Sequence, residues 1–130
     1  MQSVLSRLRD DRGSVIAEFA LLAPLVLAIT LGVLQVMFAL HVRTTLTDAA
    51  AQGARTAALA DGSLAVGEAR TWDLVQGSLP ASQVHNVEAS FTTADGLPVA
   101  QVVITADVPV IGTFGPATMN VVGRAVLERT

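Results

Sequence analysis

The chain has no cysteine and no tyrosine, and it contains one tryptophan among its 130 residues. The absence of cysteine excludes disulfides, thiolate metal ligands and a cysteine nucleophile. Aromatic residues make up 4% of the sequence and the formal net charge is −3. This composition offers neither a base-stacking platform nor a basic patch, so the sequence does not indicate a nucleic-acid partner.

Residue patterns typical of enzymes are also missing. The two histidines, His41 and His85, belong to no catalytic or metal-binding motif, and no Ser-His-Asp set, P-loop or dinucleotide fingerprint is found. Two glycine pairs are interpreted as loop glycines: Gly62 with Gly67, and Gly112 with Gly115. We therefore predict a protein that is not an enzyme and has no cofactor, metal or small-molecule substrate.

What the sequence does contain is a long apolar run without charge, from Phe19 to Leu40. As a helix this run would span about 33 Å, close to the roughly 30 Å hydrocarbon core of a membrane. It is longer than the apolar region of a signal peptide, and no small-x-small cleavage site follows it. Arg7, Arg9 and Arg12 precede the run and only Arg43 follows closely, which predicts a cytoplasmic N-terminus.

One carboxylate, Glu18, lies at the start of this run. An acid inside a spanning segment costs about 2.5–3.5 kcal/mol at the membrane centre and less near an end, so it is a functional candidate. A cut between Gly13 and Ser14 would create an α-amine four residues before Glu18, on the same helical face. The alternative is that Glu18 is solvated in the headgroup layer and pairs with Arg12.

The order of these features resembles the processing site of type IV pilin-like precursors. Gly13 ends a short basic leader, Ser14 to Ala17 follow, and Glu18 precedes the apolar helix. Two segments resemble in particular the TadE-like pseudopilins of the tight-adherence (Tad, Flp) pilus system: Phe19-Ala20-Leu21-Leu22-Ala23-Pro24 and Ala49-Ala50-Ala51-Gln52-Gly53-Ala54-Arg55-Thr56-Ala57-Ala58.

This resemblance implies that prepilin peptidase, a membrane aspartyl protease, cuts after Gly13 on the cytoplasmic face. It implies a minor pilin or pseudopilin in the bacterial inner membrane, with the extracellular pilus left open as a further location. The implied partners are prepilin peptidase, other pilins or pseudopilins, and the inner-membrane assembly platform of the pilus. Phe19 stands where the major pilins of that system carry tyrosine, which fits a minor component.

Helical periodicity continues beyond the membrane and predicts one helix from about Ser14 to about Ala60, ended by Asp61-Gly62. Its outer half has a stripe of mostly small residues: Leu46, Ala49, Ala50, Gly53, Ala54, Ala57 and Ala58. Such a stripe permits close approach, and we predict helix-packing roles for Phe19, Pro24, Ala50, Gly53, Ala54 and Ala57. The stripe packs either on a neighbouring helix or under the chain's own globular part, and both uses can coexist.

A second helix is predicted over Leu64–Leu79, with an apolar set of Leu64, Ala65, Ala69, Trp72, Val75 and Leu79. Alternation predicts strands over Asn86–Thr93 (with Val87, Ala89 and Phe91 on one face), Val99–Val108 and Met119–Leu127. Asp95-Gly96 predicts a tight turn, and Gly112–Pro116 a second break. The predicted fold class is α+β: a long N-terminal helix, transmembrane in its inner half, whose outer half packs on a small antiparallel sheet as in pilins.

These predictions divide the chain into a leader at 1–13, a transmembrane helix at 14–42, its extramembrane continuation at 43–60 and a small α+β periplasmic domain at 61–130. The predicted function is that of a minor pilin needed to assemble Tad pili in surface adherence. One alternative is a signal-anchored periplasmic interaction module of an envelope complex. Another is a pseudopilin of the type II secretion kind, which shares the cut site but not the alanine-rich segment.

Overall fold

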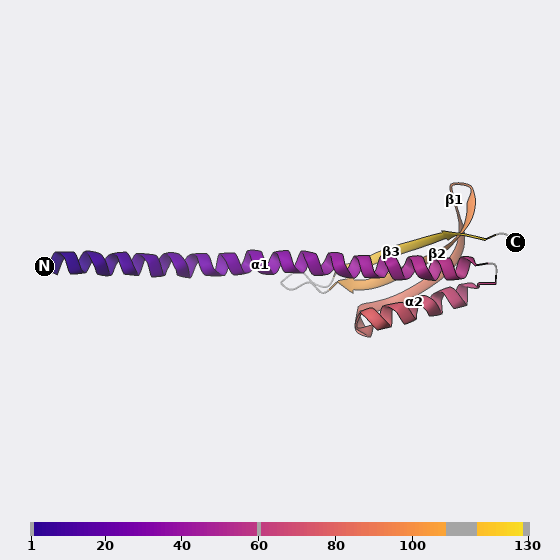
Figure 1. Cartoon of the computed structure of the whole chain (residues 1–130), viewed down its shortest axis with the longest axis horizontal. Coiled ribbons are helices and arrows are strands. Elements are labelled where there is room, and N and C mark those ends of the chain that lie inside the picture. Colours follow the sequence, from indigo (N-terminus) through magenta and orange to yellow (C-terminus); the bar gives the residue numbers. More distant parts are fainter. Residues whose placement is uncertain (1, 60, 109–116, 129–130) are drawn as a thin grey trace. The chain divides into compact units, whose positions relative to one another are not determined.

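The computed structural model describes residues 2–59, 61–108 and 117–128; the side chains of residues 2–11 and 81 are not described. The elements follow in the order α1 (Gln2–Ala58), α2 (Leu64–Ser78), the 3₁₀ turn η1 (Ala81–Gln83), β1 (Val84–Ala94), β2 (Leu97–Val108) and β3 (Ala117–Val126) (Figure 1). The α+β class, with a long N-terminal helix and a small antiparallel sheet, is confirmed. The predicted break at Gly112–Pro116 lies outside the described residues.

Helix α1 begins much earlier than predicted, at Gln2 rather than near Ser14. Its first part contains two leucines and three arginines, which favour helix, and no proline. A single internal glycine, Gly13, costs about 1 kcal/mol relative to alanine and does not stop a helix that is already nucleated. The prediction that the helix starts after the leader is therefore wrong.

The chain divides into two compact units, residues 1–37 and residues 38–130. In the inner part of α1 the large apolar side chains from Val15 to Leu40 are 45–76% exposed. Burial then begins abruptly, since Val42 and Leu46 are 0% exposed. The predicted outer helix at 43–60 and the predicted domain at 61–130 thus fall in the same unit.

The connection from α1 to α2 is held by backbone hydrogen bonds. The Gly62 N–H donates to the Leu59 carbonyl (2.8 Å), and the Glu128 N–H donates to the Ala58 carbonyl (3.0 Å). Both satisfy carbonyls that lack a partner at a helix C-terminus. Ser63 then caps α2, its hydroxyl oxygen accepting from the Val66 N–H at 3.2 Å.

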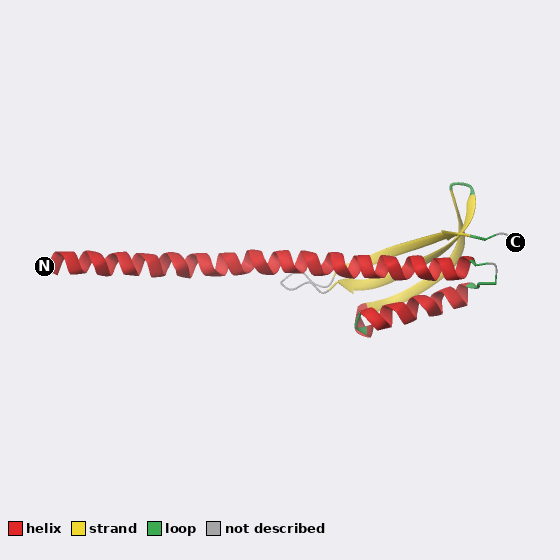
Figure 2. Ribbon diagram, in the orientation of Figure 1, coloured by secondary structure: helices red, strands yellow, loops and turns green. Residues whose placement is uncertain are grey.

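The sheet is an antiparallel meander in the order β1-β2-β3 (Figure 2). Asp95 and Gly96 form the two-residue turn between β1 and β2, with positive φ angles of 51° and 78°. Two consecutive positive φ angles are the requirement of a type I′ hairpin turn, which Asp-Gly meets readily. The turn predicted from this dipeptide is confirmed.

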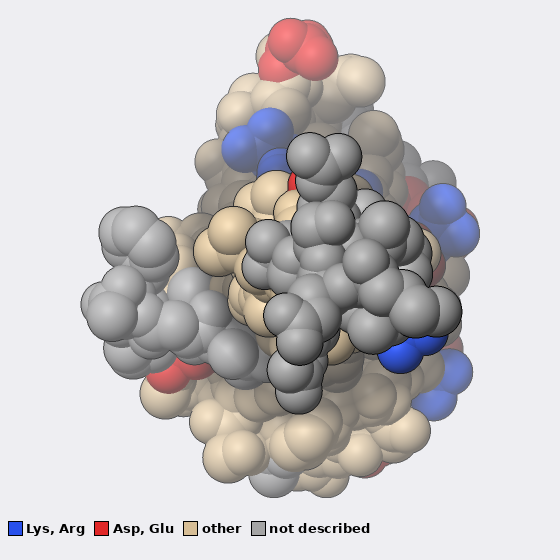
Figure 3. Space-filling model, turned by 90° about the vertical axis from the view of Figure 1, so that its left-hand side faces the viewer, with Lys and Arg blue, Asp and Glu red and all other residues tan. Residues whose placement is uncertain are grey.

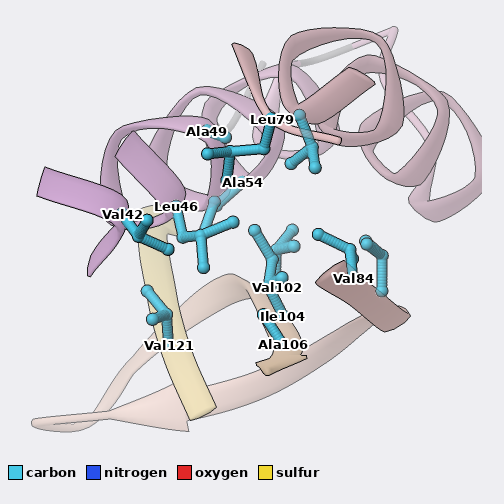
Figure 4. Close-up of a cluster of buried hydrophobic side chains, with 13 residues drawn as sticks. Val42, Leu46, Ala49, Ala54, Leu79, Val84, Val102, Ile104, Ala106 and Val121 are labelled. Atoms are coloured by element: carbon cyan, nitrogen blue, oxygen red, sulfur yellow. The ribbon is translucent and has the colours of Figure 1, made fainter. Parts of the chain in front are cut away.

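The core lies between one face of the sheet and the two helices. Figure 4 shows side chains from the outer part of α1 and from the end of α2 directed toward those of the strands. The buried cluster contains Val42, Leu46, Ala49, Ala50 and Ala54 from α1, Val75 and Leu79 from α2 and its end, and Val84, Val87, Val102, Ile104, Ala106 and Val121 from the sheet. These strand residues alternate as predicted in β2 and β3, while a bulge between Val84 and Asn86 shifts the period in β1.

Two predicted apolar faces are partly wrong. In α2 the buried residues are Gly67, Thr71 and Val75, whereas Ala65 and Ala69 are exposed. In β1, Phe91 is 53% exposed although it was placed on the buried face. The hairpin end of β1 curves away from both helices (Figure 1).

Candidate functional site

The predicted processing and charge-pairing residues lie on one uninterrupted helix. Gly13, Ser14 and Glu18 are all exposed within α1. A Cβ placed on Gly13 would meet no atom within 4 Å outside the local helix backbone. Arg12 and Glu18 do not form an ion pair with each other in the part of the chain that the structure describes. The ion pair found there joins His85 to Asp107.

An apolar groove runs along the inner part of α1 just after Glu18. It has a volume of about 410 Å³ and is lined by Phe19, Leu22, Ala23, Val26, Leu27 and Thr30. The Thr30 hydroxyl donates to the Val26 carbonyl at 2.8 Å, so its polar hydrogen is already bonded within the helix. Pro24, next to Ala23, removes the backbone N–H that would bond the Ala20 carbonyl.

The four packing residues predicted in the outer part of α1 are buried inside the chain's own domain. Ala50 and Ala54 are 0% exposed and Ala57 is 1% exposed. The closest contact is with β3: a Cβ on Gly123 would lie 2.5 Å from the Ala50 carbonyl oxygen and nearer still to Ala50 C and Ala51 N. Because these atoms belong to a helix backbone, only glycine fits at position 123.

The same helix meets α2 through a second glycine contact. A Cβ on Gly53 would collide with the Thr71 hydroxyl and lie 2.9 Å from the Gly67 carbonyl oxygen. A Cβ on Gly67 would lie 2.7 Å from the Ala57 Cβ. Thr71 is 0% exposed and its hydroxyl donates to the Gly67 carbonyl at 2.8 Å, so its buried polar atom is satisfied.

Sequence reasoning missed the partners in this packing. Gly67 was interpreted as a loop glycine and is instead buried inside α2, and Thr71 was not singled out. The signal available was the pair Gly67-x-x-x-Thr71, a small-xxx-small spacing that matches the stripe on α1. A search for apolar residues at helical spacing does not find this pair, because neither glycine nor threonine is strongly apolar.

Gly53→Ala is expected to lower the free energy of unfolding by about 2 kcal/mol, because the added methyl group overpacks the α1–α2 contact. In a Thr71→Ala background the hydroxyl that obstructs this methyl is gone, so the further cost of Gly53→Ala should fall. Urea unfolding in detergent micelles, followed through the single tryptophan, Trp72, measures both costs. If Gly53→Ala cost the same free energy of unfolding with and without Thr71→Ala, the Thr71 hydroxyl would not be what obstructs the added methyl group.

Charged groups are sparse around the domain. His85, at the bulge of β1, lies 2.5 Å from Asp107 of β2, and both side chains are partly exposed. On the face shown in Figure 3, acidic and basic side chains are dispersed among uncharged ones. Among the described residues no group of three or more His, Cys, Asp or Glu side chains is placed to hold a metal ion.

The fold and these contacts define a class: a small α+β domain built on the outer part of an N-terminal helix that is long and apolar enough to cross a membrane. Comparison with protein families makes this more specific. The family described as TadE-like protein matches residues 13–55, so this part of the chain is TadE-like, and the resemblance read from the sequence is confirmed. TadE-like proteins are associated with the Tad pilus, and the N-terminal helix of this chain is long and apolar enough to span a membrane.

The matched region begins at Gly13 and ends at Arg55, so it contains Glu18, the apolar groove and most of the buried stripe. It does not extend into α2 or the sheet. No curated protein matches the chain, and no solved structure does.

Proposed function

We propose that this chain is a minor pilin, or pseudopilin, that prepilin peptidase cuts after Gly13 and that then takes part in assembling Tad pili in surface adherence. The observation that carries the proposal is the start of the TadE-like match at Gly13, directly before the exposed apolar part of α1. The arginines of the leader would keep the N-terminus in the cytoplasm, and the domain after Phe38 would lie in the periplasm. The pilus itself would be a second location if the subunit enters the filament.

The helical form of the leader has a consequence for cleavage. Gly13 lies inside α1, and a protease needs its substrate backbone locally extended, so the helix must open around the bond to Ser14. Glycine lowers that cost by about 1 kcal/mol relative to alanine, and no other segment packs on it. The site would therefore be both accessible and easy to unwind.

Cleavage would change the electrostatics at the start of the helix. The N–H groups of Val15, Ile16 and Ala17 would lose the leader carbonyls that accept their hydrogen bonds, and Ser14 would gain a charged amine. Positive charge from the amine and the helix dipole would then gather about one turn from Glu18. We propose that the Glu18 carboxylate neutralises this charge, in its own chain or in a neighbour.

The apolar groove supplies a place where a second helix can pack. Its lining combines the small Ala23 with larger apolar side chains such as Phe19, so a large side chain of a neighbouring helix could pack there. The carbonyl left without a donor by Pro24 also needs a partner in lipid, which a packed helix can provide. We propose that other pilins or the inner-membrane assembly platform occupy this face.

Gly13→Leu is expected to block processing, because a branched side chain would stand at the cut site and would stabilise the helix there. N-terminal sequencing of the membrane-extracted protein should then find the leader retained, whereas the wild type begins at Ser14. Gly32→Leu is the matched control, since that glycine also lies in α1 with nothing within 4 Å of its added Cβ. Its processing should be normal.

The alternative is a signal-anchored periplasmic interaction module. It is favoured by the burial of the alanine-rich stripe in the chain's own domain, which leaves that stripe unavailable to a partner helix. This alternative predicts that Gly13→Leu is tolerated and that deleting prepilin peptidase leaves the gel mobility unchanged. The genes that flank this one would distinguish a Tad pseudopilin from one of the type II kind.

A further inference from the structure

The two edges of the sheet differ in how they are protected. At the β1 edge, α2 packs alongside the strand and the Ala89 N–H donates to Glu68 Oε1 at 2.9 Å. A carboxylate that accepts from an edge amide blocks the approach of another strand. No corresponding hydrogen bond to the outer edge of β3 is formed within the described residues.

The register shows which backbone groups β3 presents outward. The Leu127 N–H donates to the Pro98 carbonyl of β2 at 3.0 Å, and β2 pairs with β3 without a register shift. Because N–H and C=O directions alternate along an antiparallel strand, residues two apart point the same way. The outward groups therefore belong to Thr118, Asn120, Val122, Arg124 and Val126.

The side chains of these five residues form one exposed row on the sheet face opposite the helices. Val122 is 43% exposed and Val126 is 55% exposed, with the cation of Arg124 between them. The Arg124 Nε–H donates to Gln101 Oε1 at 2.8 Å, so its guanidinium lies over β2. The strand contains no proline and pairs with β2 without a bulge, so of the usual devices that prevent edge pairing it carries only the single charge of Arg124.

A second copy of this chain does not fit this edge. Val121 clusters with Val42 and Leu46, while Glu128 bonds to Ala58, so β3 runs in the same direction as the outer part of α1. Antiparallel pairing of two β3 strands would direct the two Phe38 ends oppositely, whereas under the proposed function both ends continue into helices that enter the same membrane. Parallel pairing in register would place the two Arg124 side chains together, and in β1 of another copy the Ala89 N–H is already bonded to Glu68.

We propose that the free edge of β3 binds an extended strand from a different protein, with apolar residues beside Val122 and Val126 and an acidic residue beside Arg124. Main-chain hydrogen bonds would hold the strand, and the alternate side chains would select it. This site lies outside the TadE-like match and does not depend on cleavage after Gly13.

The test uses the full chain in detergent micelles and a short fluorescent peptide in which valine, glutamate and valine occupy alternate positions among threonines. Asn120→Pro removes an outward N–H without touching the ladder to β2, so the domain should fold and bind the peptide about tenfold more weakly. Thr93→Pro is the matched control. By the same alternation its N–H points outward on β1, so peptide binding should equal that of the wild type.

A charge exchange tests the site without a proline. A peptide with lysine in place of glutamate should bind the wild type more weakly than the original and should bind Arg124→Glu more strongly. Peptide anisotropy measures affinity, and Trp72 fluorescence confirms the fold. The proposal is overturned if the wild type does not bind the original peptide, if Asn120→Pro and Thr93→Pro bind it equally, or if Arg124→Glu shows no reversal. Self-association that Asn120→Pro abolishes would assign the edge to a second copy instead, which also overturns it.

Discussion

Gly123→Ala is expected to lower the free energy of unfolding of the domain by about 3 kcal/mol, because the added methyl group overpacks the contact between β3 and α1. The added Cβ would lie 2.5 Å from the Ala50 carbonyl oxygen and closer to neighbouring backbone atoms of α1. A side chain could rotate away, but the backbone in the middle of a helix cannot. The whole helix must move off the sheet, which opens the core around Val121 and Ile104.

Urea unfolding of the full chain in micelles, followed by Trp72 fluorescence, measures this cost. Trp72 packs against the core cluster and is the single tryptophan, so its signal reports the domain rather than the inner part of α1. Gly77→Ala is the matched control, because a Cβ there meets nothing within 4 Å and replaces glycine inside a helix. It should stabilise the domain by about 0.5–1 kcal/mol. Equal unfolding midpoints for the two variants would contradict the close contact.

Glu18→Ala is expected to abolish pilus assembly while leaving protein level and cleavage after Gly13 unchanged. The variant would leave the new amine of Ser14 without a counter-charge at the membrane, where an unpaired charge costs several kcal/mol. Electron microscopy of cells counts the pili, and N-terminal sequencing shows whether cleavage still occurs. Glu18 is exposed and belongs to the unit of residues 1–37 rather than to the folded domain, so a folding defect of the domain is not expected.

Two further variants separate charge from shape at this position. Glu18→Gln keeps the size and hydrogen-bonding capacity but removes the charge, and we expect the same loss of pili as with alanine. Glu18→Asp keeps the charge on a shorter side chain and should retain part of the assembly. Normal pili in the Glu18→Ala strain would refute the charge-pairing role and would favour the solvated glutamate considered as the alternative.

The sequence predicted much of the fold because several signals were local. Alternation from Val99 to Val108 and the Asp95-Gly96 turn gave two elements whose geometry depends mainly on neighbours in the chain. The stripe from Leu46 to Ala58 also identified the buried face of the outer helix correctly. Periodicity is reliable here because the helix buries one face and exposes the other.

The incorrect predictions share a different cause. Gly67 and Thr71 are buried, and Ala69 is exposed, because α2 approaches α1 through its smallest residues rather than its most apolar ones. Phe91 is exposed because the covering helices do not reach the hairpin end of β1. Neither outcome depends on the hydropathy of the residue itself.

By itself the sequence determined that the N-terminal helix is apolar enough to span a membrane, that Glu18 follows Gly13 just before the apolar run, and that a small sheet follows. These follow from the transfer free energies and backbone preferences of individual residues, which act over a few positions. Only the tertiary structure decided which glycines touch a backbone, and which edge of the sheet has no hydrogen-bonded partner among the described residues. Both properties depend on how segments far apart in the chain pack together. In a close-packed interior, the distance between two segments is determined by the shapes of both packed surfaces.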